Sequence, residues 1–136
     1  LARLKKLLDR VDPSSQFIKY SGAVPHSELH TRYAQADLCL FASSCENMPN
    51  ILLEGMASGL PIACSNRGPM PEILGEAGIY FNPEYPDEIA IALKQFIIDP
   101  ELRARCAEGA YIKAQRYSWE CCAKETFTFL RQIVEN

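Results

Sequence analysis

The sequence predicts an α/β fold: a doubly wound, Rossmann-like parallel sheet with helices on both faces. Two observations favour this class. Continuous apolar runs at residues 38–42 and 61–65 are typical of strands that are buried on both faces. Segments with the apolar spacing of helices separate these runs, and strands that alternate with helices form βαβ units with parallel strands. At 136 residues the chain has the length of one domain, and we expect no repeat or linker within it.

The first expected element is a helix with an apolar stripe, ended by Pro13. The stripe consists of Leu4, Leu7, Leu8 and Val11. The chain starts at Leu1 rather than Met, and the helix has neither an N-cap nor a preceding strand to pack on. We therefore expect residues 1–136 to be part of a larger protein, with the first strand of this domain lying upstream.

A short apolar strand over residues 17–20 and a helix from Ser27 to about residue 35 are expected next. Ser27 has the side-chain oxygen that an N-cap needs. The side chains expected to point inward from this helix are those of Leu29, Tyr33 and Ala36.

The rest of the chain continues the alternation. We expect a strand at 38–42, a loop at 43–48 and a helix at 49–58 that is closed by Gly59. Two strands follow at 61–65 and 79–81, and then three helices at 86–98, 100–117 and 119–135. The residues expected to face inward on the first and last of the three helices are Leu93, Phe96 and Ile97, and Trp119, Cys122, Thr126, Leu130 and Ile133.

Composition excludes several function classes. The 14 Lys and Arg against 17 Asp and Glu give a net charge of −3 without a basic run, so nucleic-acid binding is not expected. No apolar stretch approaches the roughly 18 residues of a membrane span, so we expect no direct membrane contact from this domain. Six cysteines without a C-x2-C pair favour reduced thiols in the cytoplasm. His26 and His30 have helical spacing, but His26 precedes the expected cap, so no metal site is expected.

The loop and helix after strand 38–42 form the candidate site. Ligands of doubly wound folds bind beyond the carboxyl ends of the strands. A helix that starts there offers free N–H groups and its positive dipole end to an anion. Pro49 at the first helical position loses nothing, because that N–H would be unpaired. We therefore expect a phosphate group to bind at this edge of the sheet.

Glu54 is the one charged residue between Asn47 and Asn66. On a helical projection it lies roughly 130° from the centre of the apolar stripe. That stripe consists of Leu52, Leu53, Met56 and Ala57. A carboxylate in neutral surroundings needs hydrogen-bond donors, and sugar hydroxyls are suitable ones. Glu46 in the preceding loop is the second candidate acid.

A structural role for both acids stays open at this point. With 12 Glu in the chain, about one E-x7-E pair is expected by chance, and Glu76 and Glu84 form a second such pair. In this alternative, Glu46 is exposed to water and Glu54 pairs with a buried backbone donor.

The segment from Ser44 to Pro61 matches a longer pattern, S-x-E-x2-P-N-x-L-L-E-x-M-A-x-G-x-P. It resembles the E-x7-E signature of retaining GT-B glycosyltransferases of family 4 (group 1). The similarity continues at residues 22–24, 29–37, 68–73 and 78–82, and so covers most of residues 17–98. Ordered matches of this kind are far more specific than two acids alone.

The resemblance implies that the chain is most of the C-terminal, donor-binding domain of a GT-B fold, whose partner is an N-terminal acceptor domain. Glu46 would contact hydroxyls of the donor sugar and Glu54 the ribose hydroxyls, which makes them the implied catalytic residues. The implied donor-binding residues are Asn47, Met48, Pro49, Asn50 and Ile51 at the diphosphate or sugar, and Gly22 and Ala23 near the base. The substrate is a nucleotide-diphosphate sugar, and no cofactor or metal is implied. Whether Glu46 attacks the sugar or transfer occurs on the front face stays open.

Two departures from the family pattern concern this site. Gly68-Pro69 stands where the family has Gly-Gly, which stiffens the loop. The family's Arg and Lys that neutralise the diphosphate lie upstream of this chain. Arg67 either shares that task or is a solvated loop charge.

The expected function is transfer of a sugar from a nucleotide sugar to a glycan, lipid or small-molecule acceptor in the cytoplasm. Any attachment to a membrane surface would be made by the other half of the protein, and the chain alone is expected to be inactive. The alternative is a non-catalytic nucleotide- or sugar-binding module on the same fold. Two further alternatives are a receiver-like domain that uses Asp12 or Asp37 and a GT-B sugar epimerase.

Overall fold

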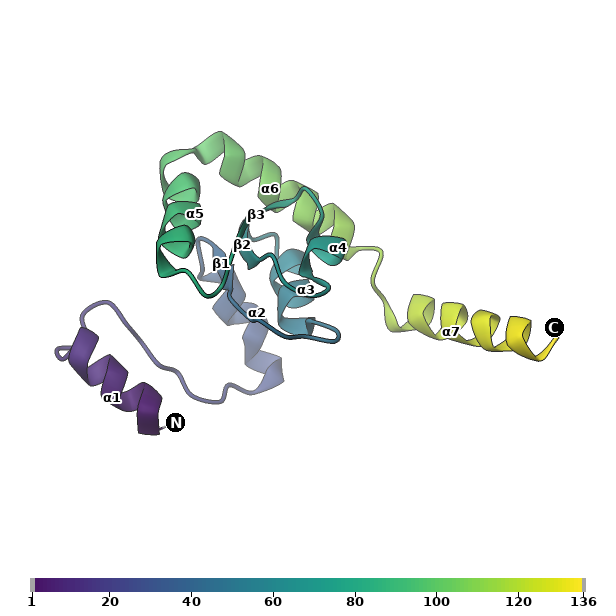
Figure 1. Cartoon of the computed structure of the whole chain (residues 1–136), viewed down its shortest axis with the longest axis horizontal. Helices are drawn as coiled ribbons and strands as arrows, with labels where there is room; N and C mark the ends of the chain where they lie inside the picture. The colour runs from purple at the N-terminus through teal and green to yellow at the C-terminus, as the bar shows by residue number, and fades with distance from the viewer. Residues whose placement is uncertain (1, 136) are drawn as a thin grey trace.

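The computed structural model describes residues 2–135 and contains a three-stranded parallel sheet (Figure 1). The strands β1 (Cys39–Phe41), β2 (Ile62–Ser65) and β3 (Gly78–Phe81) lie in the order β1-β2-β3. All four residues of β2 are buried, because a central parallel strand is covered on both faces. The parallel sheet predicted from the apolar runs is confirmed.

One face of the sheet is covered by α3 (Asn50–Ala57), α4 (Met70–Leu74) and α6 (Pro100–Ala114). Successive strand residues point to opposite faces, so only alternate ones reach these helices. The buried side chains on this face are Phe41, Leu52, Met56, Ile62, Cys64, Met70, Ile73, Leu74, Ala77, Ala110 and Ala114. The helix α4 has no predicted counterpart, because it is only five residues long and contains a proline in its first turn.

The opposite face carries α5 (Pro86–Ile98), whose Ala92 and Phe96 pack with Phe81 of β3. Helices on both faces confirm the doubly wound arrangement. The expectation that Ile97 faces inward is wrong, since Ile97 is 66% exposed. The buried side of α5 is centred on Ala92 and Phe96, and Ile97 is turned about 100° from Phe96 on the helix.

The inward side of α3 is narrower than expected. Leu52 and Met56 are fully buried, but Ala57 is exposed. Ala57 is the last residue of α3, so it lies at the edge of the contact with the sheet.

The helix α2 (His26–Ala34) begins before Ser27, with Pro25 as its N-cap and no capping side chain. The expectation that Ser27 caps this helix is therefore wrong. Pro25 has φ −56° and ψ 139°, so it supplies the extended residue that precedes a helix. Leu29 and Tyr33 are half-buried as expected, whereas Ala36 is exposed because it lies beyond the end of α2.

Residues 17–20 form no strand, contrary to expectation. The buried Asp12 carboxylate accepts hydrogen bonds of 2.7–2.9 Å from three backbone N–H groups, those of Gln16, Phe17 and Ile18. Burial alone would raise the pKa of Asp12, but the three amides together lower it. Two of these amides belong to the expected strand, and they are bonded to Asp12 instead of to a neighbouring strand.

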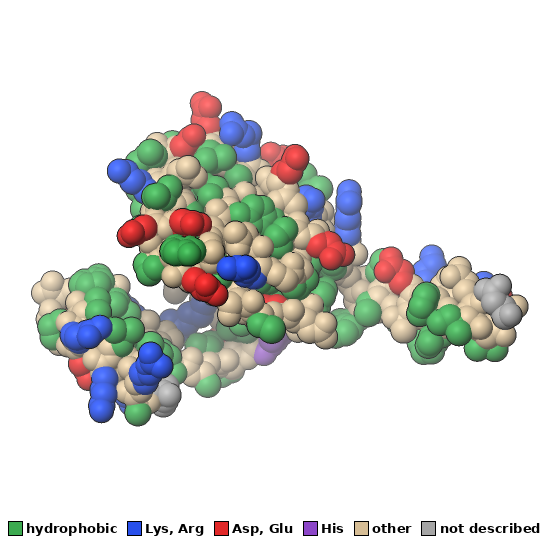
Figure 2. Space-filling model, viewed as in Figure 1, with side chains coloured by type: hydrophobic (Ala, Val, Ile, Leu, Met, Phe, Trp, Pro, Cys, Tyr) green, Lys and Arg blue, Asp and Glu red, His purple; other side chains and the backbone are tan. Residues whose placement is uncertain are grey.

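The helices α1 (Ala2–Val11) and α7 (Trp119–Val134) project from the rest of the molecule and bury no residue (Figure 1). Figure 2 shows hydrophobic side chains gathered on α7. The expected inward face of α7 is exposed, with Trp119 at 85% and the following residues also outside the core: Cys122, Thr126, Leu130 and Ile133. The helical spacing is as expected, but burial also needs a packing partner. No helix within residues 2–135 is both long and apolar enough to cross a bilayer.

Candidate functional site

The loops after the three strands meet at one edge of the sheet, as parallel strands require. The Asn66 N–H after β2 donates to the Phe81 carbonyl at the end of β3, at 2.9 Å. A Cβ at Gly68 would lie 3.7 Å from the carbonyl oxygen of Glu46. The loop that carries Glu46 therefore lies in contact with the loop after β2.

The start of α3 lies at this edge and has no capping side chain. The residues expected at the diphosphate or sugar make up this start: Asn47, Met48, Pro49, Asn50 and Ile51. Pro49 is buried and is the N-cap residue, so α3 begins at Asn50, one residue later than expected. Its carbonyl accepts the first bond of the helix, from the Leu53 N–H at 3.1 Å. The Asn50 N–H donates to the Met48 carbonyl at 3.0 Å, so the N–H groups of Ile51 and Leu52, together with the positive dipole end, remain for an anion.

Glu54 is half-buried on the side of α3 that is joined to α2. Its Oε2 accepts a hydrogen bond of 2.9 Å from the Tyr33 hydroxyl. The donor is thus a side chain 21 positions away, and not the backbone group of the structural alternative. Burial, followed by the hydrogen bond and charge of Glu54, raises the pKa of Tyr33 to about 12. The phenol therefore stays protonated, and remains a donor, above the pH at which a free tyrosine ionises.

Gly55 allows α3 to approach β1 closely. A Cβ at this position would lie 3.1 Å from Cys39 Sγ and 3.7 Å from Ile62 Cδ1. The first distance is tighter than ordinary van der Waals contact. The missing side chain therefore sets the depth at which α3 packs on the sheet, and with it the position of the adjacent Glu54.

Glu46 is half-buried in the loop after β1. Within residues 2–135 its carboxylate forms no hydrogen bond or ion pair. A carboxylate that is partly withdrawn from water retains strong acceptor capacity for hydroxyl or amide donors. Glu46 and Glu54 therefore differ, since one is unpaired and the other is held by Tyr33.

Arg67 is exposed, and its Nη2 donates to Asn82 Oδ1 at 3.3 Å. Asn82 follows β3, so the Arg67 guanidinium is held on the β2–β3 side of the edge, whereas α3 starts after β1. Of the two roles expected for Arg67, that of a solvated loop charge fits this position.

Gly22 and Ala23 lie in the exposed segment before α2. Gly22 has a φ of +68°, which favours glycine, and a Cβ there would meet no atom within 4 Å. The segment is open to a ligand, and its contact with a base stays a prediction.

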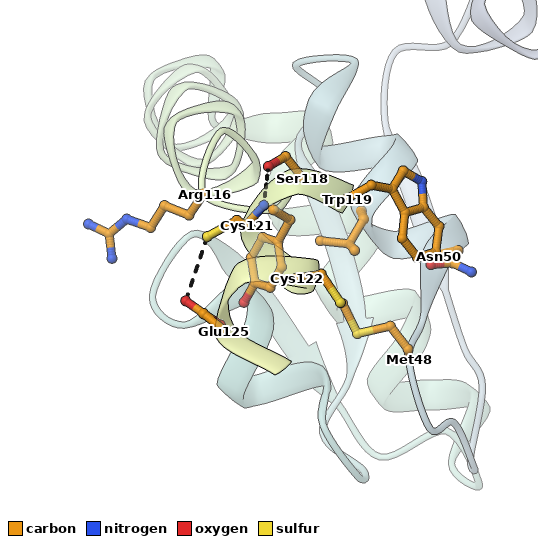
Figure 3. Close-up of a pocket in the computed structure, with 10 residues that line it drawn as sticks. Met48, Asn50, Arg116, Ser118, Trp119, Cys121, Cys122 and Glu125 are labelled. Carbon is orange, nitrogen blue, oxygen red and sulfur yellow. Dashed lines mark hydrogen bonds between the residues drawn. The ribbon is translucent and has the colours of Figure 1, made fainter. Parts of the chain in front are cut away.

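A cavity of about 560 Å³ lies between the start of α3 and the corner that joins α6 to α7 (Figure 3). Met48, Asn50 and Leu53 line it from α3 and the loop before it. The other lining residues are Arg116, Tyr117, Ser118, Trp119, Cys121, Cys122 and Glu125, and Figure 3 shows Arg116 and Glu125 on the side opposite Asn50 and Trp119. Neither Glu46 nor Glu54 lines this cavity. Sequence reasoning misses the α6–α7 corner, because no local pattern shows which helix end returns to α3.

The arrangement of His, Cys, Asp and Glu side chains decides whether the chain can bind a metal ion. No group of three or more His, Cys, Asp and Glu within residues 2–135 is arranged to hold a metal ion. His30 Nε2 lies 3.2 Å from the hydroxyl of its neighbour Thr31. All six cysteines are free thiols.

Residues 2–113 match the glycosyl transferases group 1, and the chain belongs to this family. It is 33% identical over 110 residues to the O-antigen chain mannosyltransferase B of Escherichia coli. The matched part is 81% of this chain and 29% of that enzyme.

Two solved structures share the fold. Sucrose-phosphate synthase from Thermosynechococcus elongatus matches with a TM-score of 0.85 and 22% identity, over 98% of this chain and 34% of that one. HepE of Anabaena, solved in complex with UDP, matches with a TM-score of 0.80 and 21% identity, over 96% and 36%. The chain therefore has the Rossmann-like C-terminal half of a GT-B fold, as expected, and spans about a third of the length of these proteins.

Proposed function

We propose that the protein containing this chain transfers a sugar from a nucleotide-diphosphate sugar to an acceptor, with retention of the anomeric configuration. Membership of the group 1 glycosyltransferase family supports transferase activity. The observation that carries the assignment of a donor site is the uncapped start of α3, with one half-buried carboxylate in the loop before it and one on the helix. The free amides of Ile51 and Leu52 suit a diphosphate oxygen, and the carboxylates of Glu46 and Glu54 suit hydroxyl groups.

Each part of the nucleotide sugar has a proposed contact. Glu54 accepts hydrogen bonds from the ribose hydroxyls and Glu46 from hydroxyls of the donor sugar, because both carboxylates retain acceptor capacity. The segment from Asn47 to Ile51 holds the diphosphate or the sugar, and Gly22 and Ala23 lie along the base. The nucleotide sugar is the substrate, and we propose no additional cofactor.

A second, N-terminal domain of the same protein is proposed to hold the acceptor. The chain spans 29% of the E. coli mannosyltransferase, so most of such an enzyme lies outside the matched region. The exposed apolar residues of α7, including Trp119 and Phe127, offer a surface for that domain. We propose that the whole protein acts in the cytoplasm, with any attachment to a membrane surface made by the N-terminal domain.

Replacement of either acid tests the proposal. In the protein that contains this chain, Glu46→Ala and Glu54→Ala are each expected to lower turnover about a hundredfold or more, since each removes a charged contact at the donor. Turnover is measured as release of nucleoside diphosphate, and the anomeric configuration of the product by NMR. Circular dichroism and thermal unfolding verify that the variants remain folded.

The second E-x7-E pair provides a matched control. Glu76 and Glu84 have the same spacing but are exposed and lie outside the start of α3, so Glu76→Ala and Glu84→Ala should retain turnover. Near-normal turnover in both the Glu46 and Glu54 variants would contradict the proposal. A wild-type protein that binds the donor but releases no nucleoside diphosphate with any acceptor would instead indicate a non-catalytic binding module.

A further inference from the structure

We propose that Tyr33 is a positioning residue for the nucleotide site, which orients the Glu54 carboxylate and makes the site select a ribose over a deoxyribose. The inference rests on the proposed function, because it assumes that Glu54 meets the pentose of a nucleotide. It adds a residue that lies outside the E-x7-E segment and on a different helix.

The geometry joins two separate helices through one hydrogen bond. Tyr33 lies near the end of α2, and its hydroxyl reaches Oε2 of Glu54 on α3 at 2.9 Å. Both side chains are half-buried. Within residues 2–135, Tyr33 is the one side chain that hydrogen-bonds the Glu54 carboxylate. Rotation of the carboxylate away from this position would therefore break its side-chain hydrogen bond.

The hydrogen-bond inventory of the pair decides what it can bind. A tyrosine has a single hydroxyl hydrogen, and Tyr33 donates it to Glu54. An ionised carboxylate has no hydrogen to donate. All the remaining capacity of the pair is acceptor capacity, on Oε1, on the free lone pair of Oε2 and on the phenol oxygen. Such a pair requires donors from its ligand.

A vicinal diol is the ligand group that supplies such donors. The 2′- and 3′-hydroxyls of a ribose present two O–H groups side by side, and a carboxylate held in one orientation can accept from both. A 2′-deoxynucleotide lacks one donor and leaves a partly desolvated acceptor unpaired, which is strongly unfavourable. The preference for the ribonucleotide therefore depends on the orientation of Glu54, and through it on Tyr33.

The test compares paired ligands in the protein that contains this chain. UDP, GDP and ADP and their 2′-deoxy counterparts are titrated calorimetrically into the wild type, and the pair that contains the tightest binder is then used with Tyr33→Phe. The variant should bind the ribonucleotide about tenfold more weakly, as expected for loss of a hydrogen bond to a charged group. Binding of the deoxynucleotide should change much less, so the preference for ribose falls by nearly the same factor. A merely structural bond between α2 and α3 would weaken both ligands equally, and that result would overturn the inference.

Tyr80→Phe is the matched control. The Tyr80 hydroxyl is also half-buried and donates to the Gly75 carbonyl at 2.6 Å, so this variant loses a similar bond elsewhere. It should leave the preference for ribose unchanged. An equal loss of preference in Tyr80→Phe and Tyr33→Phe would assign the effect to general loosening of the fold and overturn the inference.

Glu54→Gln separates this inference from the proposed function. If Tyr33 acts through Glu54, then Tyr33→Phe should have no further effect on the preference in a Glu54→Gln background. If Glu54→Gln abolishes the preference but Tyr33→Phe does not alter it, the inference fails and the proposed role of Glu54 stands. If Glu54→Gln leaves nucleotide binding unchanged, the proposed function itself is contradicted.

Discussion

The Glu54 carboxylate meets two requirements at one position. For the proposed role at the ribose, it has to keep a defined orientation and to retain acceptor capacity. Tyr33 supports the first by donating to Oε2, and it leaves Oε1 open for the second. The raised pKa of Tyr33, about 12, keeps this donor protonated above the pH at which a free phenol ionises. Gly55 supports the same geometry by allowing α3 to approach Cys39 closely.

The six cysteines differ in exposure, and this predicts the order in which they react. Cys45 and Cys122 are exposed, whereas Cys64 and Cys106 are buried. Burial raises the pKa of the Cys64 thiol to about 12 and also raises that of Cys106. Since the thiolate is the reactive form, a thiol reagent should modify Cys45 and Cys122 first in the folded protein. Peptide mapping by mass spectrometry after short exposure measures this order.

Denaturant provides the control for this labelling experiment. All six thiols should react in the unfolded chain, and Cys45→Ser together with Cys122→Ser should remove the fast phase. Cys121 should react later than its neighbour Cys122, since the Glu125 charge and hydrogen bond raise the pKa of its thiol. Early modification of Cys64 in the folded protein would contradict the buried position of β2.

At the scale of elements, β3 begins where it passes close to β2. A Cβ at Gly78 would lie 2.7 Å from the Ile62 carbonyl oxygen and would also overlap the Leu74 side chain. Ile62 belongs to the fully buried central strand, which has little room to move. Gly78→Ala should therefore lower the free energy of unfolding by about 2–3 kcal/mol, measured from the midpoint and slope of urea unfolding.

Gly59→Ala is the comparison for this substitution. Gly59 has a φ of +69°, but a Cβ there would meet no atom within 4 Å, so the cost is backbone strain alone. That cost is about 1 kcal/mol. If both variants lose the same free energy of unfolding, the close approach of β3 to β2 adds no cost to the alanine at Gly78.

The elements themselves were predictable to different degrees, for reasons that depend on particular residues. The helices α3, α5, α6 and α7 and the strand β2 follow from local spacing of apolar residues, which the structure reproduces. Residues 17–20 have an equally apolar pattern, but their amides bond to Asp12, five and six positions away for Phe17 and Ile18. A pattern of apolar residues does not show where backbone N–H groups find their acceptors.

For the whole molecule, one buried thiol and two half-buried phenols predict a loss of stability at high pH. The pKa of the Cys64 thiol rises from 9.0 to about 12 and that of the Tyr33 phenol from 10.0 to about 12, chiefly through burial. Burial also raises the pKa of Tyr80. The unfolded chain releases these protons at lower pH than the folded chain, so the free energy of unfolding falls as pH rises. The contribution is complete below about pH 9 and is lost progressively toward about pH 12.

Urea unfolding between about pH 8 and pH 11 measures this decline. Tyr80→Phe should make the decline shallower above about pH 10, because one of the three groups no longer titrates. A free energy of unfolding that stays constant over this range in the wild type would show that these groups are not withdrawn from water in the folded chain.

Local patterns of residues were sufficient to predict the class of fold and the segment that starts the candidate site. Both depend on short-range features: buried parallel strands need continuous apolar runs, and the isolated Glu54 is evident from its neutral neighbours. Three features are evident only in the folded chain: Tyr33 donates to Glu54, the α6–α7 corner lines a cavity together with Met48 and Asn50, and α7 exposes its apolar face. The physical reason is that each of these features joins residues far apart in the chain, or depends on what packs against a surface, and local spacing carries no information about either.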